Sequence, residues 1–281
     1  MPPEPRTVGP GLYLVSTPIG NLRDITLRAL DVLAAADLVL AEDTRVTGRL
    51  LAAYGISARL DRYDEHGARR IRPRILAILA EGGRVALVSD AGTPLISDPG
   101  YRLVSEAVAQ GSPVFSIPGP SAVTAALAIA GLPTDRFLFA GFPPSRSAAR
   151  RKFFEELAPV GATLIFFESG GRLAASLADM ALTLGPRSAV VARELTKLHE
   201  TVIRGPLESL ATDPRLAAAK GEIVVLVDRG QELPADLDDA EAALAEALTR
   251  LGPAEAASEV ARALKLPRRE LYARAIALRA R

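Results

Sequence analysis

Short apolar runs alternate with helix-like segments over the first 120 residues. The runs are aliphatic and bounded by turn residues, which is typical of buried strands. They are Leu12–Ser16, Leu38–Leu40, Val85–Val88 and Val114–Ile117. Helical spacing of apolar residues predicts helices over 25–36 and 70–80, and a third that starts at Pro99 and ends at Gly111. Asp24 and Asp98 are placed to cap the first and the last of these helices. Strands that alternate with helices of this length predict a mostly parallel sheet with helices on its faces.

A second set of strands follows the first. The candidates are Phe137–Gly141, Thr163–Phe167, Ala189–Ala192 and Ile223–Val227. Pro118–Pro120 favours a bend and predicts a boundary between two lobes. After Gly230 the strand pattern stops, and an Ala- and Leu-rich segment predicts helices over 236–250, 253–264 and 267–279. We therefore predict an α/β protein with lobes over 1–118 and 119–230 and a small all-helical domain over 231–281.

Composition limits the possible functions. The chain has 281 residues, of which 49% are hydrophobic and 24% charged, the ordinary balance of a soluble globular protein. A net charge of +1 argues against bulk coating of nucleic acid. With no cysteine and two histidines, the sequence excludes disulfides, cysteine–zinc sites and multi-histidine metal centres. No run of eighteen apolar residues and no signal-like start is present, so we expect a cytoplasmic protein without a membrane span.

Unusual loops follow the four predicted strands of the first lobe. They are Ser16–Asn21, Ala41–Arg45, Ser89–Pro94 and Ile117–Ala122. The carboxyl ends of strands form the ligand crevice of an open α/β sheet. Because the loops are rich in Gly, Pro and small polar residues, they predict one pocket for a flat, polar ligand held by backbone groups. The phosphate-loop and dinucleotide fingerprints are missing, so the ligand is not expected to be bound by its phosphates. The alternative is that these are ordinary turns.

Several stretches of the chain resemble one enzyme family. Val15–Thr26, Ala41–Arg45, Val88–Gly100, Pro118–Ala122, Phe166–Ser169 and Ala192–Lys197 carry the resemblance. They are similar to the ribosomal RNA small subunit methyltransferase I family, over about residues 12–227. The stretch around Asp90 is the most specific, since no general turn rule generates it. The helical tail resembles the family's small C-terminal domain less specifically.

The resemblance implies an enzyme of the tetrapyrrole-methylase superfamily that uses S-adenosylmethionine. It implies two α/β lobes with the cofactor in the cleft between them, and a homodimer. Its expected reaction is methylation of the ribose 2′-hydroxyl of a cytidine in 16S ribosomal RNA, as naked RNA or in the small ribosomal subunit. No metal is expected.

The resemblance also directs the choice of cofactor residues. The superfamily's loop after the third strand has a Gly-Asp-Pro-like sequence, but here Asp90 stands between Ser89 and Ala91. The alternatives are a turn cap for Asp90 and a helix N-cap for Ser121. Phe166 and Phe167 are expected to wall the adenine, with apolar core the alternative for at least one of them. Gly221-Glu222 is a further, weaker candidate. The predicted cofactor residues are Pro18, Asp90, Ala91, Gly92, Thr93, Ser121, Ala122 and Phe166.

Methyl transfer to a ribose hydroxyl needs in-line placement and a group that takes the proton. The predicted catalytic residues are Glu42, Asp43, Glu194 and Lys197, the last only if its pKa is lowered. His199 lies near them in the sequence, but a lone histidine is more often structural.

Two arginine-rich runs, over 69–74 and 146–152, point to contact with RNA phosphates. The predicted RNA-binding residues are Arg23, Arg45, Arg69, Arg70, Arg150 and Arg151. The alternative for such runs is a solvated helix face. Aromatic residues are only 5% of the chain, so we expect recognition of a shaped RNA by its backbone more than by stacking.

Two other functions compete with this interpretation. One is a superfamily methyltransferase that acts on a tetrapyrrole or on a modified protein residue. The other is a ligand-sensing DNA-binding protein whose C-terminal helices form a helix-turn-helix module. The loops at Glu42–Arg45 and Ser89–Gly100 favour the RNA branch through the resemblance.

Overall fold

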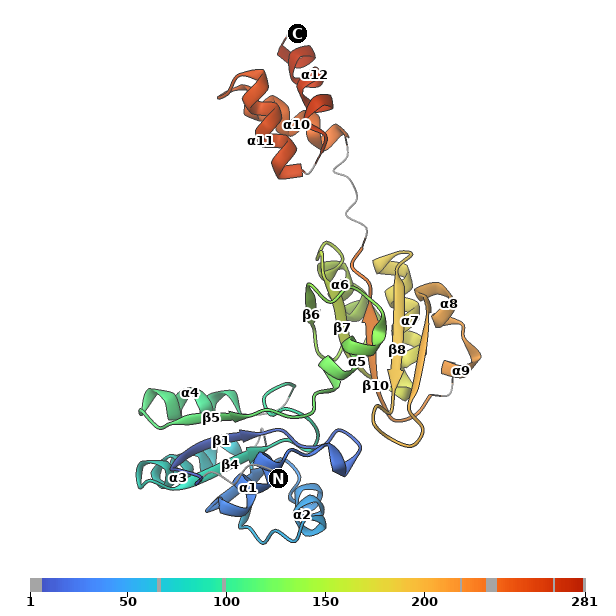
Figure 1. Cartoon of the computed structure of the whole chain (residues 1–281). Helices are drawn as coiled ribbons and strands as arrows, with labels where there is room; N and C mark the ends of the chain where they lie inside the picture. Colours follow the sequence, from blue (N-terminus) through green and yellow to red (C-terminus); the bar gives the residue numbers. More distant parts are fainter. Residues whose placement is uncertain are drawn as a thin grey trace, which may run out of the picture.

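The computed structural model describes residues 7–64, 67–97, 100–217, 219–230, 237–264 and 266–279. Figure 1 shows two α/β lobes and a separate group of C-terminal helices. Each lobe is built on a five-stranded sheet. The predicted α/β class with a C-terminal helical domain is confirmed. The two sheets differ in the direction of their strands, and this difference positions the site.

The first sheet was predicted to be mostly parallel and is parallel throughout, with strand order β3-β2-β4-β1-β5. Its strands are β1 (Gly11–Val15), β2 (Leu38–Ala41), β3 (Leu60–Arg62), β4 (Arg84–Val88) and β5 (Val114–Ile117). Its helices are η1 (Leu22–Asp24), α1 (Leu27–Ala35), α2 (Thr44–Ala53), α3 (Ala68–Ala80) and α4 (Tyr101–Ala109). Apolar residues of α1 and α2 pack on one face of the sheet, and those of α3 and α4 on the other. All five strands therefore end at one edge, where their loops meet.

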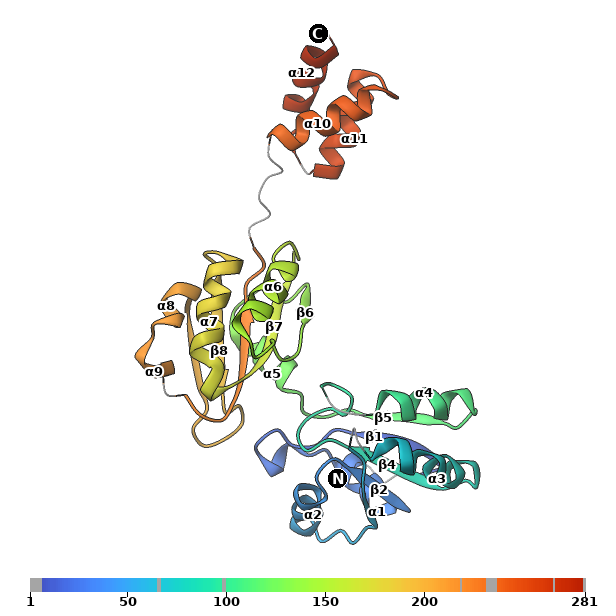
Figure 2. The same cartoon turned by 180° about the vertical axis from the view of Figure 1, so that it is seen from behind.

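The second sheet is mixed, with strand order β6-β7-β10-β8-β9, and only its β6–β7 pair is parallel. Its strands are β6 (Phe137–Phe139), β7 (Thr163–Ser169), β8 (Ser188–Arg193), β9 (Thr201–Pro206) and β10 (Glu222–Val227). Its helices are α5 (Ala122–Ala130), α6 (Ser147–Leu157), α7 (Gly170–Leu184), α8 (Leu207–Ala211) and α9 (Pro214–Ala217). Helix α5 covers one face, and α6 to α9 cover the other, which Figure 2 shows from behind.

The C-terminal helices are α10 (Leu237–Leu248), α11 (Pro253–Leu264) and α12 (Arg268–Arg279). They bury an alanine-rich core of their own, centred on Leu244, Val260 and Leu271. The three predicted helices are present within a few residues of their expected bounds.

Three details of the first lobe correct the sequence-based expectations. Asp24 does not cap α1, since it ends the short helix η1, and the hydroxyl of Thr26 accepts the N–H of Ala29 instead. Helix α4 begins at Tyr101 and not at Pro99. Asp98 and Pro99 themselves lie outside the described residues. Helix α2 and strand β3 were not expected, and neither was β9 in the second lobe.

Candidate functional site

The loops after β1, β4 and β5 are tied together at the carboxyl edge of the first sheet. Thr17 and Gly92 exchange two backbone hydrogen bonds, N to O, of 2.9 and 3.0 Å. The Thr93 hydroxyl lies 3.1 Å from the Ser16 hydroxyl and 3.2 Å from the carbonyl oxygen of Pro120. These hydrogen bonds satisfy polar groups of all three loops. The three loops therefore form one continuous wall.

Asp90 joins the loop after β2 to the same wall. Its Oδ1 accepts the backbone N–H of Asp43 at 2.9 Å. Asp43 caps α2 by accepting the N–H of Arg45 at 2.8 Å, and its Oδ2 lies 2.6 Å from the guanidinium of Arg45. The hydrogen bonds from the Arg45 side chain and backbone hold the pKa of Asp43 well below its usual range.

The loop between β4 and α4 has an uncommon backbone conformation. Gly92 has a φ of 84°, which glycine adopts without cost. Leu95 and Ser97 have φ values of 71° and 69°, which side chains with a Cβ seldom adopt. Such conformations are held in place by their surroundings and concentrate at functional sites.

The second lobe approaches this wall through the loop after β8. A Cβ on Gly20 would lie 2.5 Å from Cγ of Lys197 and 2.9 Å from the carbonyl oxygen of Leu195. Only a residue without a side chain allows the two loops to come this close. Gly20 therefore closes one end of the cleft between the lobes.

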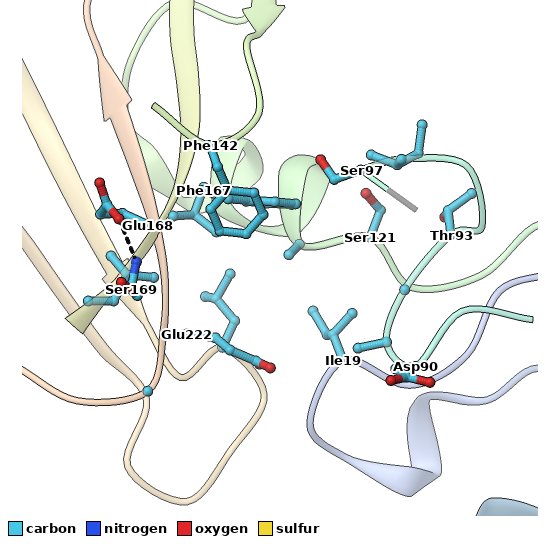
Figure 3. Close-up of a pocket in the computed structure, with 18 residues that line it drawn as sticks. Ile19, Asp90, Thr93, Ser97, Ser121, Phe142, Phe167, Glu168, Ser169 and Glu222 are labelled. Atoms are coloured by element: carbon cyan, nitrogen blue, oxygen red, sulfur yellow. Dashed lines mark hydrogen bonds between the residues drawn. The ribbon is translucent and has the colours of Figure 1, made fainter. Parts of the chain in front are cut away.

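A cavity of about 330 Å³ lies between the lobes. Figure 3 shows Phe142 and Phe167 on the side of the second lobe, opposite Ile19 and Asp90 of the first. The residues that line it are Ile19, Asp90, Ala91, Gly92, Thr93, Ile96, Ser97, Ser121, Ala122, Phe142, Phe167, Glu168, Ser169, Leu195, Gly221, Glu222, Ile223 and Val224. These lining residues include three acidic side chains and no Lys or Arg. The cavity is thus suited to a neutral or cationic ligand with an aromatic or apolar part, and not to a phosphate.

Six of the eight predicted cofactor residues line this cavity. They are Asp90, Ala91, Gly92, Thr93, Ser121 and Ala122. Phe166 does not, because its side chain is fully buried in the core on the opposite face of β7. Phe167 lines the cavity in its place. Pro18 lines a neighbouring cavity. The side chain of Ser121 makes no capping hydrogen bond at the start of α5, although Ser121 stands at the N-cap position.

Two of the predicted catalytic residues, Glu194 and Lys197, form an ion-pair network with Glu222. Nζ of Lys197 lies 3.0 Å from Oε1 of Glu194 and 3.0 Å from Oε2 of Glu222. The N–H of Glu222 and the ammonium of Lys197 lower the pKa of Glu194. Partial burial lowers the pKa of Lys197, but its bonds to the two glutamates outweigh burial and raise it. Lys197 is therefore an ammonium ion at neutral pH, and the lowered pKa on which its predicted role as proton acceptor depends is not found.

The loop that carries this network is itself strained. Glu194 and Thr196 have positive φ values of 52° and 66°. Glu222 lines the cavity and Lys197 borders Gly20, so the network lies between the cavity and the contact of the two lobes. His199 is exposed and lines neither this cavity nor the neighbouring one.

The predicted RNA-binding arginines fall into two groups. Arg23, Arg45, Arg69 and Arg70 are exposed on the first lobe. Arg150 is buried, and its guanidinium lies 2.6 Å from Oδ2 of Asp179. The prediction that Arg150 contacts RNA is wrong, because its charge is already neutralised inside the second lobe. Arg151 is half-exposed and lies 2.7 Å from Oδ1 of Asp179.

Phe142 and Leu195 are among the lining residues of the cavity that sequence reasoning missed. Phe142 follows Gly141 in a segment whose composition predicts a loop. Its ring packs edge-on against that of Phe167, with 5.5 Å between the ring centroids. Strand periodicity was the available signal for Phe167. Alternate side chains of β7 point to opposite faces, so only one of two adjacent phenylalanines can face the cleft.

Comparisons with known proteins agree with the fold. The model of the tetrapyrrole (corrin/porphyrin) methylases matches residues 11–211. The solved structure of a diphthine synthase superposes with a TM-score of 0.62 at 19% identity, covering 77% of this chain and 89% of that one. The two lobes and their cleft therefore have the tetrapyrrole methylase fold.

The similarity to curated relatives is closer. A ribosomal RNA small subunit methyltransferase I from Mesorhizobium japonicum is 50% identical, over 98% of this chain and 94% of its own length. Its counterpart from Erythrobacter litoralis is 53% identical, over 97% and 96%. A model described as the RsmI C-terminal HTH domain matches residues 234–279. The chain belongs to the ribosomal RNA small subunit methyltransferase I family.

Two further observations concern the described part of the chain. None of its helices combines the length and the apolar character needed to cross a membrane. No group of three or more His, Asp or Glu side chains is gathered there in a way that would hold a metal ion.

Proposed function

We propose that the chain is an S-adenosylmethionine-dependent methyltransferase that modifies the ribose 2′-hydroxyl of a cytidine in 16S ribosomal RNA. The observation that carries the proposal is its 50% identity, over nearly the full length of both chains, with a ribosomal RNA small subunit methyltransferase I. The enclosed cavity at the strand ends supplies a place for the cofactor. The chemistry of this cavity supports the proposal independently.

The residues of the cavity fit S-adenosylmethionine. Its sulfonium is positively charged, and Asp90 and Glu222 are on the cavity wall without any basic lining residue. Phe142 and Phe167 offer apolar ring surfaces for the adenine. The first N–H groups of α5, which starts at Ala122, have no partner within the helix and are available to polar cofactor atoms. When bound, the cofactor supplies an electrophilic methyl group.

The residues of this chain must hold the acceptor hydroxyl in line and take its proton. Asp43 and Glu194 are ionised over a wide pH range because their pKa values are lowered by their partners. That makes them weak bases and suits them to hold loops in position. The three predicted carboxylates are Glu42, Asp43 and Glu194. Each is replaced in turn, and the proton acceptor is the residue whose replacement abolishes the fall of the methyl-transfer rate at acid pH.

The first lobe offers a surface for the RNA backbone. Each of the helices α1 to α4 has an arginine as its second residue: Arg28, Arg45, Arg69 and Arg102. All four are exposed. Helices that follow parallel strands begin at the carboxyl edge of the sheet, so these arginines lie around the edge that carries the cavity.

The position of Arg28, Arg69 and Arg102 at the helix ends is unfavourable for stability, whereas Arg45 is paired with Asp43. The N-terminus of a helix carries a partial positive charge, which favours acidic side chains there and disfavours basic ones. The first turns of α1 to α4 nevertheless contain no acidic residue. A phosphate bound at this edge would reverse the penalty, since it is attracted both by the guanidinium groups and by the helix ends. We therefore include Arg28 and Arg102 with Arg23, Arg45, Arg69 and Arg70 in the proposed RNA surface.

Transfer of a labelled methyl group distinguishes the proposed substrate from its alternatives. The full chain is incubated with S-adenosylmethionine labelled in its methyl group and with small ribosomal subunits, naked 16S ribosomal RNA, a tetrapyrrole or duplex DNA. We expect label in the 16S ribosomal RNA, either naked or within the subunit. Label in the tetrapyrrole or in a ribosomal protein would favour the other methyltransferases of the superfamily. Tight binding of DNA without any transfer would favour a ligand-sensing DNA-binding protein.

The assembly state and the cellular compartment belong to the same proposal. The family resemblance implies a cytoplasmic homodimer, and light scattering of the purified chain tests the dimer.

A further inference from the structure

A second cavity, of about 320 Å³, lies beside the first. It is bounded by the loop after β1, by helix α2 and by the end of β4. The residues that line it are Thr17, Pro18, Gly20, Leu22, Val46, Thr47, Arg49, Leu50, Ser89 and Asp90. It is thus built from two of the most specific motifs of the sequence, but the cofactor proposed above does not use it.

The two cavities meet at Asp90. This residue lines both, whereas the loop after β1 divides them, with Ile19 on one side and Pro18 and Gly20 on the other. Oδ1 of Asp90 is held by the N–H of Asp43, which fixes the carboxylate at the junction. A molecule in the second cavity therefore reaches the cofactor cavity at this carboxylate.

One buried hydroxyl in the second cavity has no partner. Thr47 is only 2% exposed, and its Oγ1 makes no hydrogen bond within the described residues. The two other buried hydroxyl residues of the cavity are satisfied, since Thr17 donates to the carbonyl oxygen of Ser89 and Ser89 donates to that of Gly92. A buried polar group is almost always paired, so the unpaired Thr47 hydroxyl indicates a ligand that completes it.

The other walls of this cavity indicate the class of that ligand. Leu22 and Val46 are large apolar side chains that stay 49% and 39% exposed. Arg49, also exposed, lines the cavity and has no ion pair among the described residues. Apolar walls, one inner hydroxyl and one outer guanidinium match the base, the sugar and the phosphate of a single nucleotide.

We propose that the second cavity receives the unstacked nucleotide whose ribose is methylated, with the Thr47 hydroxyl bonded to its base or sugar. The proposal rests on the function proposed above and deepens it by naming the acceptor site. Arg49 holds a phosphate of that nucleotide at the rim. Thr47 and Arg49 are positioning residues: they place the acceptor hydroxyl toward the junction at Asp90 and leave cofactor binding unaffected.

The substitution Thr47→Val tests this inference, because it removes the hydroxyl and keeps the shape of the side chain. The measurements are kcat and KM for methyl transfer to small ribosomal subunits, the Kd of S-adenosylmethionine and the Tm. We expect kcat/KM to fall about tenfold or more, because one hydrogen bond to the substrate is lost. The Kd of the cofactor stays the same, and the Tm stays the same or rises, since an unpaired buried hydroxyl has been removed. Thr47→Ser keeps a hydroxyl and should restore most of the transfer.

Thr183→Val is the matched control. Thr183 lies in α7, where its hydroxyl bonds the carbonyl oxygen of Asp179, and it lines neither cavity. Its loss should leave methyl transfer unchanged. A Thr47→Val variant that transfers methyl groups like the wild type would overturn the inference. Failure of the wild type itself to methylate any RNA would instead refute the proposed function, so the two failures are distinguishable.

Arg49→Gln provides a second, independent variant at an exposed position where folding is not at risk. We expect a several-fold rise of KM for the subunit. We also expect a weaker dependence on salt, with the slope of log KM against log salt concentration reduced by about one. Arg59→Gln removes another exposed arginine, which precedes β3 and so lies at the opposite edge of the sheet. The inference fails if the two arginine variants behave alike.

Discussion

Two arginine-rich segments look alike in the sequence but differ in the structure. One is the run over 69–74 at the start of α3, and the other is the run over 146–152 at the start of α6. In the first, Arg69 and Arg70 are exposed and have no ion pair among the described residues. In the second, Arg150 and Arg151 both bind Asp179, and Arg150 is buried with it.

The difference lies in a carboxylate that is distant in the sequence. Asp179 stands 29 positions after Arg150, on α7, and packing of α6 against α7 brings the two together. A run of like charges is therefore no evidence for an interface until its partners are known. Even the first run is divided, since Arg72 pairs with Glu106 and Arg74 with Asp61.

The largest expected effect comes from breaking the buried pair. Arg150→Ala leaves the Asp179 carboxylate buried with only Arg151 and Ser147 as partners. Loss of one member of a buried pair costs about 3–5 kcal/mol, so we expect a large fall in the free energy of unfolding by denaturant titration. In the double variant Arg150→Met, Asp179→Leu, most of this stability should return. If Arg150→Ala is as stable as the wild type, the pair is not structural.

The exposed run should behave in the opposite way. Arg69→Glu with Arg70→Glu removes two positive charges from the proposed RNA surface and adds two negative ones. Binding of small ribosomal subunits should weaken about 10- to 100-fold at moderate salt, with a smaller slope of log Kd against log salt concentration. The Tm should stay the same or rise slightly, because acidic residues favour the first turn of a helix. Unchanged affinity for the subunit would remove this edge from the RNA surface.

Acid should weaken the buried pair. Burial raises the pKa of Asp179, but the bonds from Arg151, Ser147 and Arg150 outweigh it and lower the pKa below its ordinary value of about 4. The ion pair of Asp179 therefore contributes its full stabilisation above about pH 4. This contribution is lost as the pH falls through the lower pKa of Asp179 in the folded protein. In Asp179→Asn, the unfolding free energy should depend less on pH below about 4 than in the wild type. An identical pH dependence would assign the acid sensitivity to other carboxylates.

The smallest effect is expected for Arg151→Ala. The Arg151 side chain is 49% exposed, so water screens its ion pair with Asp179. We expect a loss of less than about 1 kcal/mol in unfolding free energy and little change in subunit binding. A tenfold loss of subunit affinity without loss of stability would return Arg151 to the RNA surface.

The parallel first lobe was predictable because its strands are continuous apolar runs separated by helical spacing. The elements that were missed have weak patterns. Strand β3 is only Leu60–Arg62, with two charged residues, and β9 contains Arg204, Gly205 and Pro206 at an edge of the second sheet. An edge strand needs no apolar face on its outer side, so periodicity does not reveal it.

The cofactor loops were predictable from the motifs, but their partners in space were not. Asp90, Gly92 and Thr93 line the cavity as expected. The bond from the N–H of Asp43 to Asp90, and the contact of Gly20 with Lys197, join segments far apart in the sequence. For the same reason the raised pKa of Lys197 could not be foreseen, because it depends on Glu222 in a different strand.

The most direct test of the central claim is to identify the atom that receives the methyl group. Small ribosomal subunits are incubated with the full chain and S-adenosylmethionine labelled in its methyl group, and their 16S ribosomal RNA is digested to nucleosides for mass analysis. The account predicts label in 2′-O-methylcytidine from a single position. Label on a base, on a ribosomal protein or on no component of the subunit would contradict it.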